Sequence, residues 1–244
     1  MRSGIAGLGA CVVLACSPLH AAGEDVVATL LGHEITGVDI ADPSDGASPV
    51  PRLFERIWLP LSRHYIDENG LAATKAELGE AAAYHREFDR KDRDQRARKL
   101  QELEERLAGE GIEARERAWL EEFRAVLQRL ARRDAEIDLE PPLDPSREAG
   151  QLAPWIETWK LNRAIYERYG GVVALTRLGP DPRGARAALI ADYERRGLLE
   201  FADAVLRARL FEWLEAPPSM PIPPGDVDFT PYWRRTIPPS YFPD

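Results

Sequence analysis

The chain contains very little cysteine. Its two cysteines, Cys11 and Cys16, lie within the first sixteen of 244 residues. The rest of the chain can therefore form neither a disulfide framework nor a thiolate metal site. Beyond residue 22 the only histidines are His33, His64 and His85, and none has the second histidine that a zinc-binding helix places four residues away. We therefore expect no metal site and no cofactor.

Positive charge is also scarce, because 32 lysines and arginines stand against 41 aspartates and glutamates, a formal net charge of −9 at pH 7. Binding to nucleic acid depends on clustered positive charge, so it is not expected. The chain has no glycine-rich phosphate loop and no Gly-x-Ser-x-Gly motif, which leaves catalytic residues unassigned. It also has no uncharged apolar run long enough to cross a bilayer, so no transmembrane segment is expected.

The first 22 residues have the pattern of an export signal. Arg2 precedes a short apolar run from Ile5 to Cys16, and the small residues Ala21 and Ala22 follow. This pattern predicts cleavage near residue 22 and a periplasmic or secreted location. As an alternative, the sequence Val-Leu-Ala-Cys ending at Cys16 loosely resembles a lipoprotein box, in which Cys16 would carry a lipid anchor.

The spacing of apolar residues predicts a mostly α, two-lobed protein. Val26–Leu31 and Glu34–Thr36 flank a Gly-His turn and predict a short β-hairpin, which a further strand near Val172–Leu175 could join. We place a first helical lobe at residues 23–140, a linker rich in proline and turn residues at 141–151, and a second helical lobe at 152–216.

Within the first lobe, two long helices are expected to form a hairpin. Thr74 and Glu77 have capping-box spacing and predict a helix start. Residues 89–99 have almost no apolar face, which is typical of either a solvated helix or a flexible bridge. Gly109 and Gly111 then predict the break between the two helices.

The last 28 residues, 217–244, contain nine prolines. Aromatic residues are spread among these prolines: Phe229, Tyr232, Trp233, Tyr241 and Phe242. Proline lowers the entropy lost on ordering, and each ring can bury a large apolar area. We therefore expect an extended strap that aromatic side chains pin to the body.

The most distinctive segment is the helix expected over Trp155–Gly171. Helical spacing aligns Trp155, Trp159, Asn162, Tyr166 and Tyr169 in one stripe. One interpretation is core packing, in which Asn162 bonds to a neighbouring backbone. The other is the wall of a groove that binds a peptide or a small ligand, with these candidate binding residues: Trp159, Asn162, Arg163, Tyr166 and Tyr169.

Three segments in the order Val26–Thr36, Leu53–Tyr65 and Gly70–Leu78 resemble the N-terminal domain of SurA-type periplasmic chaperones and related peptidyl-prolyl isomerases. The resemblance covers about a quarter of the chain. It implies a helical core that cradles extended, unfolded polypeptide. The parvulin domain that carries isomerase activity in that family has no counterpart between Glu77 and Asp244.

Two functional hypotheses follow. The first is an exported, non-catalytic, chaperone-like protein that binds unfolded or extended polypeptide. The second is a periplasmic enzyme or small-ligand protein with its site on the Trp155–Gly171 helix. A long open groove with few polar groups favours the first, and a closed cavity that contains Asn162 and Arg163 favours the second.

Overall fold

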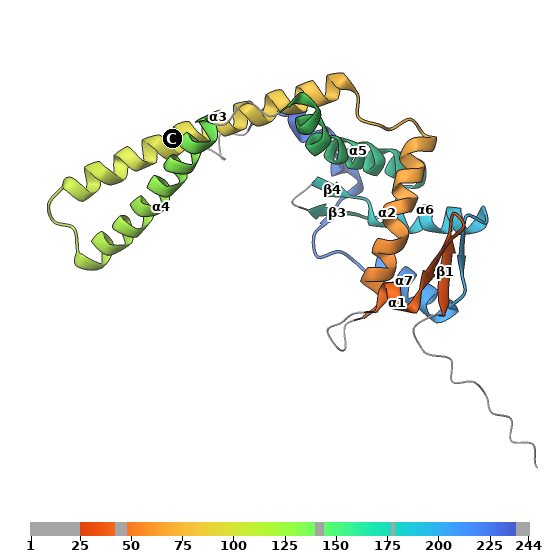
Figure 1. The fold of residues 1–244 in the computed structure, drawn as a ribbon. Coiled ribbons are helices and arrows are strands. Elements are labelled where there is room, and N and C mark those ends of the chain that lie inside the picture. Colours follow the sequence, from red (N-terminus) through yellow and green to blue (C-terminus); the bar gives the residue numbers. More distant parts are fainter. Residues whose placement is uncertain (1–24, 42–47, 140–143, 177–178, 238–244) are drawn as a thin grey trace, which may run out of the picture.

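The computed structural model describes residues 25–41, 48–139, 144–176 and 179–237. The expectation of a mostly helical protein with a few short strands is confirmed. Figure 1 shows a body and a long helical arm that projects from it. The helices are α1 (Gly37–Ile40), α2 (Val50–Glu68), α3 (Lys75–Ala108), α4 (Ala114–Leu139), α5 (Pro145–Tyr169), α6 (Arg183–Arg195) and α7 (Ala204–Glu215). The strands are β1 (Val26–Leu30), β2 (His33–Thr36), β3 (Val173–Thr176), β4 (Gly179–Asp181), β5 (Leu199–Phe201) and β6 (Pro221–Ile222), and two 3₁₀ turns are η1 (Pro224–Asp226) and η2 (Tyr232–Arg234).

The N-terminal hairpin forms as expected from β1 and β2, but the expected Gly-His turn was wrong by one residue. The turn is made by Leu31 and Gly32, which both have positive φ angles, of 52° and 82°, and His33 is the first residue of β2. The strand that joins the hairpin is β5, giving the antiparallel order β2-β1-β5. The segment near Val172–Leu175, expected as a candidate for that place, instead contributes β3 to a second sheet of order β4-β3-β6. The reason is that the chain turns back after α6, and the Leu31 amide donates to the Leu198 carbonyl at 2.8 Å.

Residues from both expected lobes meet in one hydrophobic core. Leu53, Ile57 and Leu61 of α2 are fully buried, as are Ile190 of α6 and Leu210 of α7. Helix α2 therefore packs between the first sheet and the C-terminal helices, and it continues through Pro60. Burial of this apolar set supplies the main driving force for folding the body.

The expected linker, residues 141–151, is helical from Pro145 onward, so the prediction was wrong for that part. Asp144 is the N-cap of α5, and its side chain accepts from the Ser146 amide at 2.7 Å. Pro145 is the first residue of α5. Proline has no backbone N–H, but an N–H in the first turn of a helix would have no partner in the helix anyway, so the proline is tolerated there. The same composition that indicates a loop is thus compatible with a helix start. Residues 141–143 lie outside the described residues.

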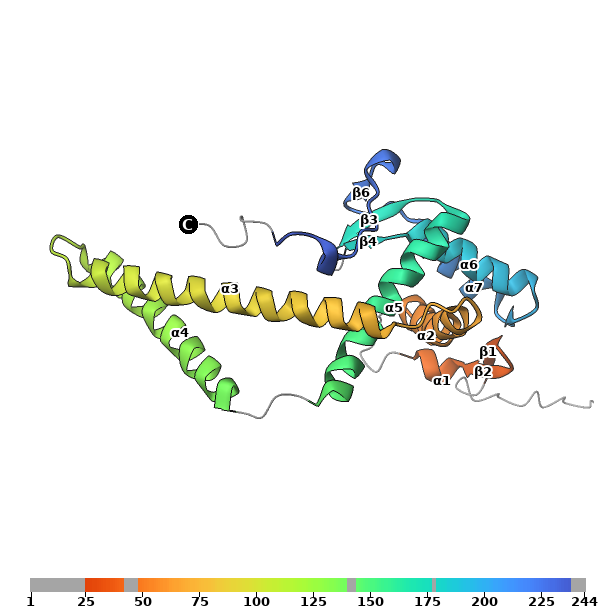
Figure 2. The same cartoon turned by 90° about the horizontal axis from the view of Figure 1, so that it is seen from above.

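The arm, formed by α3 and α4, is the expected helical hairpin (Figure 2). Thr74 and Glu77 form the predicted capping box at its start. The charged segment 89–99 is part of the continuous helix α3, where Arg96 bridges to Asp134 of α4 at 2.7 Å. Farther out, four leucines form the small core between the helices: Leu103, Leu107, Leu120 and Leu127.

The strap packs against the body over its described part, residues 217–237. Trp233 is 6% exposed, and it lies against Trp159 and Ile156 of α5 and Ala81 of α3. Next to it, Arg234 pairs with Glu80 at 2.7 Å. The expected aromatic anchors Tyr241 and Phe242 lie outside the described residues. In the described ranges, no helix is both long and apolar enough to span a membrane.

Candidate functional site

The strap covers two residues of the aromatic stripe of α5, Trp159 and Tyr166. The ring of Trp159 is 8% exposed, and its indole N–H donates to the Phe229 carbonyl at 2.7 Å. On another side it touches Gly179, where an added Cβ would lie 2.6 Å from the indole ring. Trp155, one turn earlier, is 50% exposed and lies outside this packing. Trp159 is therefore a packing centre between α5, β4 and the strap.

Asn162 is the buried amide of the stripe, at 9% exposure. Its Nδ2 donates to the Pro180 carbonyl and its Oδ1 accepts from Arg186, both at 3.4 Å. Arg186 also pairs with Asp181 at 2.8 Å. Burial lowers the pKa of Arg186, and the charge of Asp181 opposes that shift. Asn162 thus ties α5 to β4 and α6, as the core-packing interpretation expects.

The other three candidate binding residues point to different surroundings. Arg163 is exposed and pairs with Glu167 at 2.7 Å. The ring of Tyr166 packs on Phe229, with centroids 5.2 Å apart. Tyr169 lies on the α2–α6 side, where burial raises the pKa of its hydroxyl. The five residues are therefore not brought together around one cavity.

A polar cluster near Tyr169 joins α2 to α6. His64 Nδ1 lies 2.8 Å from the hydroxyl of Tyr193, and Arg196 pairs with Glu68 at 3.0 Å. Tyr193 is fully buried, and this burial raises the pKa of its hydroxyl. Tyr193 is buried between the helices, while Glu68 and Arg196 are exposed at the edge of the contact, so these bonds orient α2 against α6.

A concave site lies elsewhere, between α6 and α7, and we call it the α6–α7 hollow. It has a volume of about 370 Å³. Its lining is Gly171, Val172, Arg183, Gly184, Ala187, Ala188, Ala191, Phe211, Leu214, Glu215, Ala216 and Pro218. Only Arg183 and Glu215 among these are titratable, so the hollow is an apolar concavity with one cation and one anion at its margin.

Small residues create the space in the hollow. At Gly184 an added Cβ would lie 2.8 Å from the Val172 amide nitrogen, so the loop after α5 can approach α6 only because glycine stands there. Ala188 and Ala191, along the same helix, leave room above the helix surface. Sequence reasoning missed this site, although the small residues at 184, 187, 188 and 191 repeat at helical spacing.

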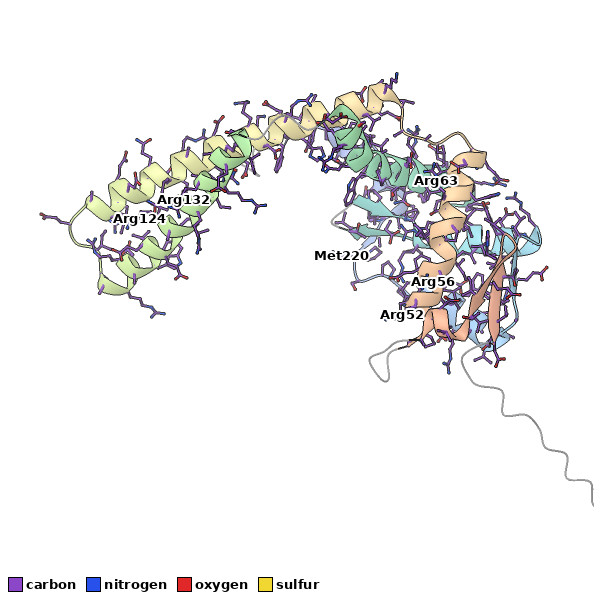
Figure 3. All side chains as sticks on the ribbon, in the orientation of Figure 1. Arg52, Arg56, Arg63, Arg124, Arg132 and Met220 are labelled. Carbon is purple, nitrogen blue, oxygen red and sulfur yellow. The ribbon has the colours of Figure 1, made fainter. Side chains whose placement is uncertain are left out.

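Exposed apolar side chains occur near the hollow in the chain. Val172, which lines the hollow, and Leu175 and Met220 are 52%, 51% and 58% exposed. Leu175 and Met220 are neighbours, because the Leu175 amide donates to the Met220 carbonyl at 2.8 Å. Figure 3 shows Met220 at the margin of the body. Clustered exposure of large apolar side chains is typical of a surface that binds another molecule.

The hollow offers little for catalysis. Arg183 donates to the Trp213 carbonyl at 3.0 Å, and its guanidinium lies 5.6 Å from the centroid of that indole ring. Within the part of the chain that the structure describes, no three side chains of histidine, cysteine, aspartate or glutamate are grouped as metal ligands would be. The hollow can shield an apolar group of a bound molecule from water. Arg183 or Glu215 can pair with a charged group of that molecule.

Comparison with protein-family models, with curated proteins and with solved structures finds no match to this chain.

Proposed function

We propose that this protein is an exported, non-catalytic, chaperone-like protein that binds extended or unfolded polypeptide. The observation that carries the proposal is the α6–α7 hollow, an apolar concavity whose lining includes the half-exposed Val172; Leu175 and Met220, which are also exposed, follow on β3 and just before β6. An extended client could place one apolar side chain in the hollow and the next ones on this surface.

The size and chemistry of the hollow support a side chain as its occupant. A volume of about 370 Å³ is near the lower end of the roughly 300–1,000 Å³ of ligand pockets. Its lining has few polar groups to orient a small polar molecule. Glu215 and Arg183 lie at the margin, where they could pair with charged groups of a client without being buried.

The SurA-type resemblance of Val26–Thr36, Leu53–Tyr65 and Gly70–Leu78 is in keeping with this function and belongs to the same proposal. So does the periplasmic location, which rests on residues 1–22, outside the described residues. Intact-mass measurement of protein recovered from the periplasm tests it. Loss of about 22 residues is expected, retention of Met1 contradicts export, and a lipid adduct on Cys16 selects the lipoprotein alternative.

The binding test uses a permanently unfolded, reduced and carboxymethylated protein as the probe, with affinity measured by fluorescence anisotropy. Ala188→Phe fills the hollow, so binding should weaken about tenfold or more, since burial of one apolar side chain is worth about 1.5–3 kcal/mol. Ala208→Phe on the exposed face of α7 is the matched control. Equal affinity of the two variants, or no binding by the unmodified protein, would contradict the proposal.

A further inference from the structure

Helix α4 carries a second apolar stripe in addition to the leucines that face α3. Leu120 and Leu127 are buried against α3. About 80° around the helix lies another series: Trp119, Phe123, Val126, Leu130 and Ile137. Phe123 and Leu130 are half-buried and also pack against the leucines. Trp119 is 61% exposed and Ile137 is 45% exposed. We call this series the α4 stripe.

The α4 stripe is long and lies on the projecting arm. It spans nineteen residues, from Trp119 to Ile137, or about 27 Å at 1.5 Å per residue. The ring of Phe123 lies beside that of Trp119, with centroids 5.7 Å apart and the planes tilted by 31°, so the outer end of the stripe is a pair of aromatic rings. Figures 1 and 2 both show the arm extending away from the body, where another molecule can reach it.

Charges along α4 change sign within the length of the stripe. Glu122 stands beside its outer half. The middle, residues 123–133, holds four arginines and no acid: Arg124, Arg129, Arg132 and Arg133. Asp134 and Glu136 follow toward the inner end. Figure 3 shows Arg124 and Arg132 on this helix. When two copies of the helix run in opposite directions, Glu122 of each copy can lie opposite the arginine-rich segment of the other.

One pair of charges defines how two copies would fit. Glu122 and Arg133 are eleven residues apart, three helical turns, so they lie on the same flank of the α4 stripe. Both are exposed, and neither has an ion-pair partner among the residues that the structure describes. An antiparallel pair with its two-fold axis between Leu127 and Gln128 places Glu122 of one copy opposite Arg133 of the other.

The same axis also aligns the apolar residues. It places Trp119 within one residue of Ile137 of the second copy, and Val126 within one residue of Leu130 of the second copy. An isologous two-fold contact uses each pair twice, so one register serves both ends. The alignments that the charged pair and the apolar pairs favour therefore agree to within one residue, about 1.5 Å along the helix.

We propose that the α4 stripe is the interface of a homodimer, in which two arms pack antiparallel along α4 with Glu122 paired to Arg133 of the second copy. Two helices in contact over about 27 Å bury less than the roughly 1,600 Å² of a standard interface. The dimer should therefore be weak, and the fraction of dimer should rise with protein concentration.

Sedimentation velocity on the full chain across the micromolar range tests the proposal. Glu122→Arg and Arg133→Glu each place like charges opposite each other, so each should weaken dimerisation about tenfold or more. The double variant restores an opposite pair and should recover most of the affinity. Glu121→Arg, the same change on the face away from the stripe, is the matched control and should leave the dimer unchanged.

Trp119→Ser removes the indole ring from the outer end of the stripe and should also weaken the dimer at least about tenfold. Circular dichroism confirms that each variant is folded. A protein that is monomeric throughout, a dimer insensitive to Trp119→Ser, or a folded double variant that does not recover affinity would overturn the proposal.

Discussion

The indole N–H of Trp159 donates to the backbone carbonyl of Phe229 at 2.7 Å, and this bond links helix α5 to the strap seventy residues later. The ring of Trp233 lies against the same indole, with centroids 6.1 Å apart. One side chain of α5 thus serves both as hydrogen-bond donor and as apolar platform for the strap. The strap is consequently part of the folded unit.

We expect removal of the strap to destabilise the body. Ending the chain after Ala216 exposes Trp159 and removes Trp233, whose loss alone is worth about 3–5 kcal/mol in a core. At about 2–4 °C per kcal/mol for a protein of this size, the melting temperature should fall by roughly 10 °C. The control ends the chain after Ile237 and keeps Trp233. Equal melting temperatures for the two truncations would show that the strap does not stabilise the body.

Trp159→Phe should remove the hydrogen bond together with part of the packing of the indole ring. Phenylalanine keeps an aromatic ring but has no donor for the Phe229 carbonyl, and an unpaired polar group of this kind costs about 1–3 kcal/mol. Trp155→Phe, on the half-exposed part of the same helix, should change stability by less than about 0.5 kcal/mol. Urea unfolding of both variants gives the comparison, and a similar loss for both would contradict the assigned bond.

Stability should fall in acid partly through Glu77. Burial alone would raise the pKa of Glu77, but hydrogen bonds from Thr74 and the nearby Lys160 ammonium outweigh it and lower that pKa from its ordinary value of 4.5. A carboxyl with a lowered folded-state pKa contributes stability above pH 4.5, and the contribution is lost as the pH falls through the folded-state value. Glu77→Gln should thus be less stable than the unmodified protein at pH 7, and the difference should shrink below pH 4.5.

The matched control for this pH effect is Glu104→Gln, since Glu104 is exposed and has no ion pair among the described residues. Its stability should follow that of the unmodified protein at every pH. Urea midpoints measured from pH 3 to pH 8 make the comparison. A stability difference for Glu77→Gln that does not change with pH would show that the cap acts without its charge.

Two glycines should respond to alanine in opposite directions. Gly179 has a φ of 101°, and a Cβ there would lie 2.6 Å from the Trp159 ring, so Gly179→Ala should cost at least about 2 kcal/mol. Gly79 lies in α3 with open space around it, so Gly79→Ala should gain about 0.5–1 kcal/mol through helix propensity. Thermal melts of the pair check both signs. A tolerated Gly179→Ala would mean that the indole can move away from β4.

Interactions between residues close in the chain were predictable, because they depend on few neighbours. The capping box of Thr74 and Glu77 involves four consecutive residues, and the arm turns at Gly109 and Gly111 as their spacing indicates. The hairpin of β1 and β2 likewise closes over two residues. The sequence by itself determined these features, together with the mostly helical class and the aromatic character of the strap.

Other features depend on where distant segments meet, and only the tertiary structure decided them. Any short apolar segment could have paired with β1, and β5 does so because the turn after α6 brings Leu199 back to it. The α5 stripe had two interpretations until the strap was seen to cover Trp159. The α6–α7 hollow is lined by four segments: the loop after α5, helices α6 and α7, and the start of the strap. A local sequence pattern cannot predict a space between segments that meet only in the folded chain.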